Sequence, residues 1–114
     1  MSGIYVFLGG GAGALLRYSV SILVSTLSLP LWVGTLFVNT LGSIILVLFY
    51  DLIISLDLEK QLLLRVGFLG ALTTFSTMSF EIIDMIKKGS VLAGGGILIL
   101  NILFGIVVGV FLSR

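Results

Sequence analysis

Polar side chains recur at regular spacing in the second of several long hydrophobic segments. Thr35, Asn39 and Ser43 follow one another at intervals of four residues, which places them on one face of a helix. A polar face inside a hydrophobic segment must contact protein or water, because lipid supplies no hydrogen bonds. The NH₂ group of Asn39 can donate either to an anion or to a neighbouring helix. Both interpretations stay open at this point.

A second polar cluster lies in the middle of the third hydrophobic segment. Residues 67–80 contain five hydroxyl side chains and two glycines, a composition that disfavours a continuous helix. Non-helical backbone at membrane depth persists only where it is buried in protein or lines a cavity. The carbonyls of such a break are ligands for a hard monovalent cation, and its amide protons suit a hard anion. The alternative is a regular helix whose hydroxyls bond to its own carbonyls; the central position favours the break.

Arg17 is a charged residue inside the first hydrophobic segment, next to Tyr18. A charge in a bilayer is costly, so an arginine there is directed to a partner, an aqueous cavity or the interface. Arg17 is therefore either a structural clamp on carbonyl and carboxylate groups or an electrostatic attractant for an anion. The sequence favours neither of these roles over the other.

Four hydrophobic segments must position these side chains. The chain has 114 residues, of which 59% are hydrophobic and 10% charged, far from the composition of a soluble domain. A helix crosses a bilayer in about 20 apolar residues. The segments run over about 3–27, 31–56, 62–86 and 91–112. The sequence predicts one all-α transmembrane domain over 1–114, with four membrane-spanning helices, the third broken near its middle, and a multi-pass location in the cell membrane.

Composition also excludes several classes of function. The chain has no cysteine and no histidine, which removes thiolate chemistry, the usual zinc ligands and the commonest general base. We therefore expect no enzyme. The net charge of +1 supplies no basic field for nucleic acid, so we expect no nucleic-acid partner.

Glycine spacing indicates closely packed helix faces. Gly9 with Gly13 and Gly105 with Gly109 form GxxxG pairs. Such pairs allow the backbones of neighbouring membrane helices to approach each other. We expect packing, without a direct functional role, from these glycines.

Positive charges at the segment ends are nearly balanced between the two sides of the membrane. Lys and Arg near span ends prefer the cytoplasmic side. One side would carry Lys60, Arg65 and Arg114, and the other Lys87 and Lys88. On one interpretation, this balance permits insertion in both orientations, in which case two opposite copies can pair about an axis in the membrane plane. Alternatively, the loops are so short that the count of positive charges carries little information. Charge alone favours neither.

Three stretches together resemble the dual-topology fluoride channels of bacteria, the CrcB or Fluc-like exporters. They are GGGAGALLRY at 9–18, GTLFVNTLGS at 34–43 and GFLGALTTFSTMSFE at 67–81. The motifs occur in the family's order, and their combination is specific, whereas the fourth segment matches only in general character. The resemblance implies a fluoride-selective channel that lets cytoplasmic fluoride leave passively. It also implies an antiparallel homodimer in the lipid bilayer, with separate pores.

The resemblance assigns roles to individual residues. Asn39 matches an asparagine on the fluoride path. Phe75 matches an aromatic residue whose ring edge, the positive part of its quadrupole, faces the anion. A sodium ion that is not transported is implied at the dimer centre, bound by the backbone carbonyls of Gly70 and Thr73.

Four further positions are expected on or beside the fluoride path, and two of them depart from the family pattern. The hydroxyls of Thr74 and Ser76 flank the pore or the break. Met78 replaces the second aromatic of the usual TTFSTF motif, and its thioether presents no positive ring edge. Asn101 stands where the family often has a tyrosine. These departures permit a heterodimer with a related subunit as the alternative to the homodimer.

Two other classes of membrane protein compete with the channel. Small multidrug exporters have a similar size and four spans, but they need a carboxylate in the first span. Here the first span has none, and Asp51, Glu81 and Asp84 fall near span ends. A non-transporting scaffold protein would explain the glycine faces, but it would leave the hydroxyl cluster of the third span unexplained.

Overall fold

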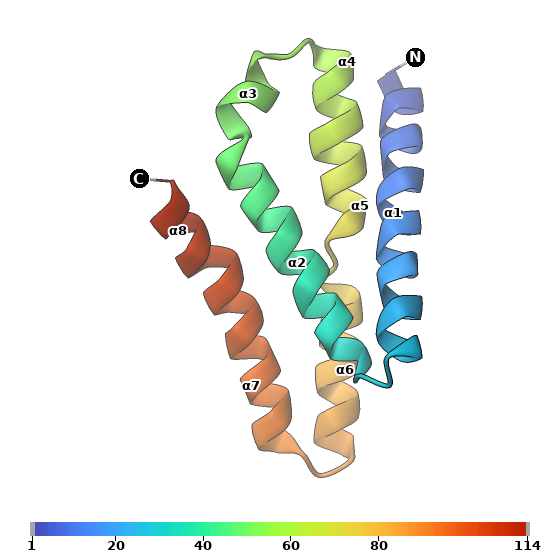
Figure 1. Cartoon of the computed structure of the whole chain (residues 1–114), viewed down its shortest axis with the longest axis vertical. Helices are drawn as coiled ribbons and strands as arrows, with labels where there is room; N and C mark the ends of the chain where they lie inside the picture. The colour runs from blue at the N-terminus through green and yellow to red at the C-terminus, as the bar shows by residue number, and fades with distance from the viewer. Residues whose placement is uncertain (1, 114) are drawn as a thin grey trace.

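The computed structural model describes residues 2–113, and this part of the chain contains helices and no strands. Four helices are long and apolar enough to cross a membrane: Ser2–Thr26, Leu31–Leu48, Leu58–Lys87 and Val91–Leu112. They run alternately down and up, so that both ends of the chain lie toward the upper end of the molecule (Figure 1). The prediction of four membrane-spanning helices is confirmed. Arg114, which enters the charge balance, lies outside the described residues.

The four spans are divided into shorter elements. The first span is α1 (Ser2–Thr26), and the second comprises α2 (Leu31–Leu48) and α3 (Tyr50–Ser55). The third comprises α4 (Leu58–Gln61), the π-helical segment η1 (Leu62–Leu69), α5 (Gly70–Leu72) and α6 (Ser76–Lys87). The fourth comprises α7 (Val91–Ile102), the π-helical segment η2 (Leu103–Val107) and α8 (Val108–Leu112).

Two boundaries differ from the sequence prediction. The predicted second segment is interrupted by a turn at Phe49, whose φ of −107° and ψ of 13° leave the helical region. The third span begins earlier than expected, at Leu58, because Asp57 caps it. The Asp57 carboxylate accepts a hydrogen bond of 3.0 Å from the backbone N–H of Lys60, which satisfies a donor at the start of the helix.

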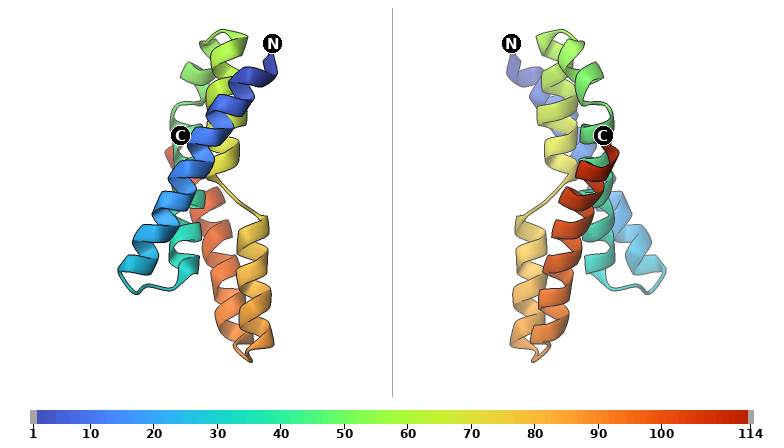
Figure 2. Two further views of the ribbon diagram at one scale, coloured as in Figure 1. Left: turned by 90° about the vertical axis from the view of Figure 1, so that its right-hand side faces the viewer. Right: turned by 90° about the vertical axis from the view of Figure 1, so that its left-hand side faces the viewer.

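The third span loses its helical backbone at residues 73–75. Thr73 is extended, with φ −83° and ψ 152°, and α6 begins at Ser76. The non-helical backbone thus lies within the stretch where the sequence analysis expects a break. Figure 2 shows the consequence: the part of the span before Thr73 lies beside α1, whereas α6 turns away from α1 and lies beside α7.

Glycines bring α1 into backbone contact with the third span. A Cβ added to Gly9 or Gly13 would overlap the backbone carbonyl oxygen of Leu63 or Phe68. A Cβ added to Gly67 would lie 2.8 Å from the carbonyl oxygen of Val6. No side chain larger than hydrogen fits at these positions, so the close packing expected of Gly9 and Gly13 is confirmed.

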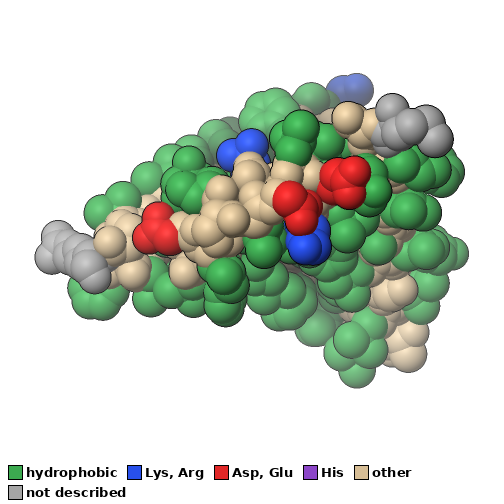
Figure 3. Space-filling model, turned by 90° about the horizontal axis from the view of Figure 1, so that it is seen from above, with side chains coloured by type: hydrophobic (Ala, Val, Ile, Leu, Met, Phe, Trp, Pro, Cys, Tyr) green, Lys and Arg blue, Asp and Glu red, His purple; other side chains and the backbone are tan. Residues whose placement is uncertain are grey.

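The exterior of the molecule is apolar along its length. Only a small core is fully enclosed, centred on Val38 and Leu72, and most large hydrophobic side chains are exposed, as lipid-facing side chains are. Seen from above, acidic and basic side chains lie among hydrophobic ones at the upper end (Figure 3). There Lys60 and Asp57 form an ion pair of 2.8 Å between Nζ and Oδ2.

Candidate functional site

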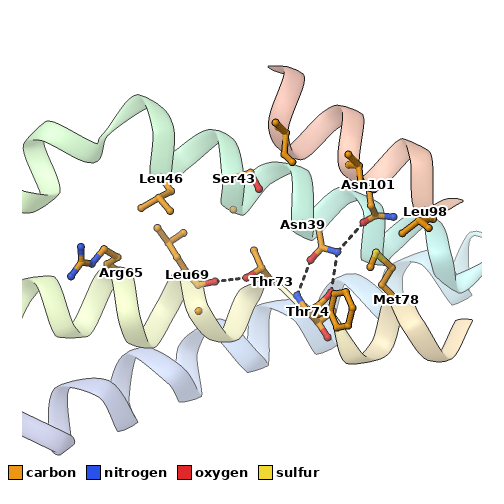
Figure 4. Close-up of a pocket in the computed structure, with 15 residues that line it drawn as sticks. Asn39, Ser43, Leu46, Arg65, Leu69, Thr73, Thr74, Met78, Leu98 and Asn101 are labelled. Atoms are coloured by element: carbon orange, nitrogen blue, oxygen red, sulfur yellow. Dashed lines mark hydrogen bonds between the residues drawn. The ribbon is translucent and has the colours of Figure 1, made fainter. Parts of the chain in front are cut away.

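A groove of about 650 Å³ lies where α2, the third span and the fourth span face one another. Its lining is mostly apolar, with polar groups from all three spans. The close-up in Figure 4 shows these groups along the groove, from Arg65 at one end, past Ser43 and Thr73, to Asn39, Asn101 and Met78 at the other. The non-helical backbone of the third span forms one wall.

Asn39 is bonded to the non-helical backbone through two hydrogen bonds. Its Oδ1 accepts from the backbone N–H of Thr74 at 2.7 Å, and its Nδ2 donates to the Thr74 carbonyl at 3.0 Å. The amide therefore replaces both partners that Thr74 would find in a regular helix. This pairing explains how non-helical backbone is tolerated at this depth, since its polar groups must be satisfied by protein.

Asn39 also bonds to the fourth span. Its Nδ2 donates to Oδ1 of Asn101 at 2.9 Å, and Nδ2 of Asn101 donates to the Ile97 carbonyl at 2.9 Å. The contacts that each amide makes with backbone groups determine which end carries oxygen and which carries nitrogen. Asn39 thus joins α2, the third span and α7, so the helix-joining interpretation of this residue holds. The anion-donor interpretation requires an anion in the groove to replace one of these acceptors.

Arg17 contacts the third span immediately before the break. Its Nε donates to the backbone carbonyl of Ala71 at 3.0 Å. A carbonyl at the end of a helix has no intrahelical donor, and the guanidinium supplies one across 54 residues of sequence. The sequence allowed two roles for Arg17, a structural clamp or an attractant for an anion. This contact supports the role of a clamp.

Residues predicted to bind sodium, Gly70 and Thr73, and residues predicted on the fluoride path meet at the groove. Gly70, Thr73, Thr74, Phe75 and Met78 all line it. Phe75 is 76% exposed, whereas Met78 is 7% exposed and packs within the chain.

Ser76 lies outside the set of residues that line the groove in this single chain. It starts α6 and is exposed.

The sequence analysis treated Arg65 and Glu81 only as charges near span ends, but the structure gives each a specific place. Arg65 was counted only as a charge near a span end, yet among the described residues that line the groove it is the one charged side chain. Glu81 was placed near a span end, but its Oε1 accepts a hydrogen bond of 2.8 Å from Thr35. Within the described part of the chain, its buried Oε2 has no partner. The four-residue spacing of Thr35 and Asn39 is the signal that could have suggested a partner for each on the third span.

Beside the non-helical backbone the groove offers neutral amide and hydroxyl groups, and its one charged side chain among the described residues, Arg65, lies at the other end (Figure 4). Within residues 2–113, no three Asp, Glu, His or Cys side chains converge as they do around a metal ion. Neutral donors replace the hydration of an ion without binding it as tightly as a full charge does. The arrangement therefore suits the passage of a small ion.

Comparisons with known proteins point to one family. The family model described as "CrcB-like protein, Camphor Resistance (CrcB)" matches residues 4–112. Over 100 residues the chain is 40% identical to "Fluoride-specific ion channel FluC 1" of Yersinia pestis, an alignment that covers 85% of this chain and 79% of the relative.

Two archaeal relatives are similar over more of the chain. The chain is 40% identical over 111 residues to "Fluoride-specific ion channel FluC" of Pyrococcus furiosus, with 94% of this chain and 85% of the relative covered. It is 44% identical over 110 residues to the protein of the same name from Methanococcus maripaludis, with 94% and 88% covered. The similarity therefore extends over all four spans.

Proposed function

Because this chain belongs to the CrcB-like family, we propose that it is a fluoride-specific ion channel, which lowers cytoplasmic fluoride by letting the anion leave passively. The main structural support for this function is the hydrogen-bonded cluster of Asn39, Thr74 and Asn101. This cluster borders an open groove at the non-helical backbone of the third span. The chain is a multi-pass membrane protein and not an enzyme.

The driving force of the proposed export is the electrochemical gradient. Hydrogen fluoride is a neutral weak acid that crosses membranes and ionises in the less acidic cytoplasm. An open path for the anion then lets fluoride leave without ATP or a proton-coupling residue. Weak neutral donors such as the Asn39 amide, and the positive ring edge of Phe75, favour entry without preventing release.

The break in the third span also supports a structural sodium ion. Sodium prefers oxygen ligands, and Gly70 and Thr73 both line the groove. The extended conformation of Thr73 turns its carbonyl out of the helical pattern. The carbonyls of Gly70 and Thr73 would hold the ion, which would supply a fixed positive charge and satisfy carbonyls that a bilayer leaves without donors.

The open groove, with its polar groups, favours a dimer. Polar groups along the groove need protein or water beside them, since lipid offers no hydrogen bonds. A second copy of this chain, inserted in the opposite orientation, would cover the groove and the exposed ring of Phe75. We propose the antiparallel homodimer; a related partner subunit is the alternative, motivated by Met78 and Asn101.

A flux assay tests the proposed function. Purified protein in liposomes should release fluoride when sodium is present and hardly any chloride under the same gradient. Equal efflux of chloride would contradict the selectivity, and protein-free liposomes give the background. Single cysteines introduced into this cysteine-free chain and labelled from each side of the membrane report whether both orientations are inserted.

A further inference from the structure

The donors of the Asn39 amide are fully used within the chain. Its NH₂ group has two N–H bonds, and these donate to the Thr74 carbonyl at 3.0 Å and to Oδ1 of Asn101 at 2.9 Å. An anion can therefore bind Asn39 only by replacing one of these two acceptors. The affinity for the anion depends on which of these two acceptors the anion replaces.

The two acceptors differ in how easily they can move. The Thr74 carbonyl is part of a reciprocal pair, because the N–H of Thr74 donates to Oδ1 of Asn39 at 2.7 Å. Moving it would shift the backbone. The Asn101 acceptor is the end of a side chain on the edge of the groove. Rotation of that side chain breaks its bonds to Asn39 and to the Ile97 carbonyl, but it leaves the backbone in place.

We propose that Oδ1 of Asn101 occupies the position that fluoride takes when it passes Asn39. This inference rests on the proposed function and makes Asn101 an internal competitor for the anion. A partly negative oxygen that accepts an amide N–H at 2.9 Å marks a position where an anion meets the same donor. The competition weakens binding, and weak binding promotes release of the ion. Asn101 therefore sets the fluoride affinity of the pathway.

Removal of the competing oxygen should tighten fluoride binding. Asn101→Leu keeps a side chain of similar size without an acceptor, and Asn101→Ala is a second variant in case leucine disturbs folding. In liposomes with sodium, the half-saturating fluoride concentration for flux should fall roughly two- to twelvefold, the factor that corresponds to one net hydrogen bond. The fluoride-dependent rise in melting temperature should begin at correspondingly lower concentration, because binding stabilises the folded state.

Two controls separate competition from a structural effect. Ile99→Ala changes an exposed residue of the same helix outside the groove and should leave the half-saturating concentration unchanged. In an Asn39→Ala background, Asn101→Leu should no longer shift the onset of fluoride-dependent stabilisation, since the competition acts through the Asn39 donor.

The outcomes distinguish this inference from the proposed function. If the wild-type protein releases no fluoride, the channel function itself fails. If the wild type conducts but both Asn101 variants fold and leave the half-saturating concentration unchanged or higher, Asn101 is not a competitor and the inference is overturned. A lower half-saturating concentration that persists in the Asn39→Ala background also overturns it.

Discussion

The two halves of the third span contact their neighbours in opposite ways. Residues 58–72 pack against α1 backbone to backbone, at glycines that leave no room for a Cβ. Residues 73–87 turn toward α2 and α7, and here the side chain of Asn39 bonds to the Thr74 backbone beside an open groove. The first half is attached through close backbone contacts, and the second through polar groups beside a groove that both halves line.

This difference shows how one helix can combine anchoring with a polar pathway. Close glycine contacts hold the first half in place by dispersion and weak backbone contacts, which do not need polar side chains. The second half can then be non-helical, because Asn39 supplies the hydrogen bonds that the helix has lost. We expect the stability of the glycine interface with α1 to depend on side-chain volume. We expect conduction past the Asn39 amide cluster to depend on charge.

The largest effect is expected from added volume at the glycine interface. Gly9→Ala would place a methyl group on the Leu63 carbonyl oxygen, which belongs to the backbone and cannot move aside. We expect a loss of about 3 kcal/mol or more in the free energy of unfolding, measured as loss of monodisperse protein and a lower melting temperature. Gly11→Ala is the matched control, because a Cβ there meets no atom within 4 Å. Equal stability of both variants would contradict the difference in packing.

A charge in the amide cluster should block conduction with a smaller effect on folding. Asn39→Asp places a carboxylate where Asn39 donates to Thr74 and Asn101. Like charges brought together cost several kcal/mol, so fluoride flux should fall at least about a hundredfold. Asn39→Ala is the neutral counterpart and should retain more flux than the aspartate. Undiminished flux in a folded Asn39→Asp variant would remove Asn39 from the pathway.

Arg17 connects the two interfaces, since it extends from α1 to the carbonyl just before the break. Loss of a hydrogen bond from a charged donor costs about 1.5–3 kcal/mol, so Arg17→Leu should lower the melting temperature. If Arg17 is a clamp, Arg17→Lys should also have a lowered melting temperature, because the lysine ammonium lacks the planar geometry of the guanidinium group. If Arg17→Lys keeps full flux while Arg17→Leu loses it only at low fluoride and low salt, the residue attracts the anion instead.

The smallest effect is expected at the solvent-exposed start of the third span. Hydrogen bonds from the side chain and then the backbone N–H of Lys60 lower the pKa of the Asp57 carboxyl. A carboxyl with a lowered folded-state pKa stabilises the fold above its unfolded pKa of about 3.9 and loses this contribution as the pH falls through the folded-state value. The melting temperature of Asp57→Asn should therefore lie slightly below that of the wild type at pH 7. The difference should shrink below about pH 4; a constant difference would contradict this role.

Several features followed from local pattern. The four spans follow from hydrophobic length, and the shared face of Thr35, Asn39 and Ser43 follows from helical periodicity. The location of the non-helical backbone at Thr73 was indicated by the crowding of hydroxyl residues at mid-span. The roles of Gly70 and Thr73 in binding sodium stay predictions, as do the roles of six residues on the fluoride path: Asn39, Thr74, Phe75, Ser76, Met78 and Asn101.

The sequence by itself determined which segments are long and apolar enough to cross a membrane and that the second helix carries a polar face, because hydrophobic length and helical period are local properties. Only the tertiary structure decided that Asn39 meets Asn101, that Arg17 meets Ala71 and that Glu81 meets Thr35. These partners are 46 to 62 residues apart. Their contact depends on the rotation and offset of whole helices, which glycine packing and the break at Thr73 set together.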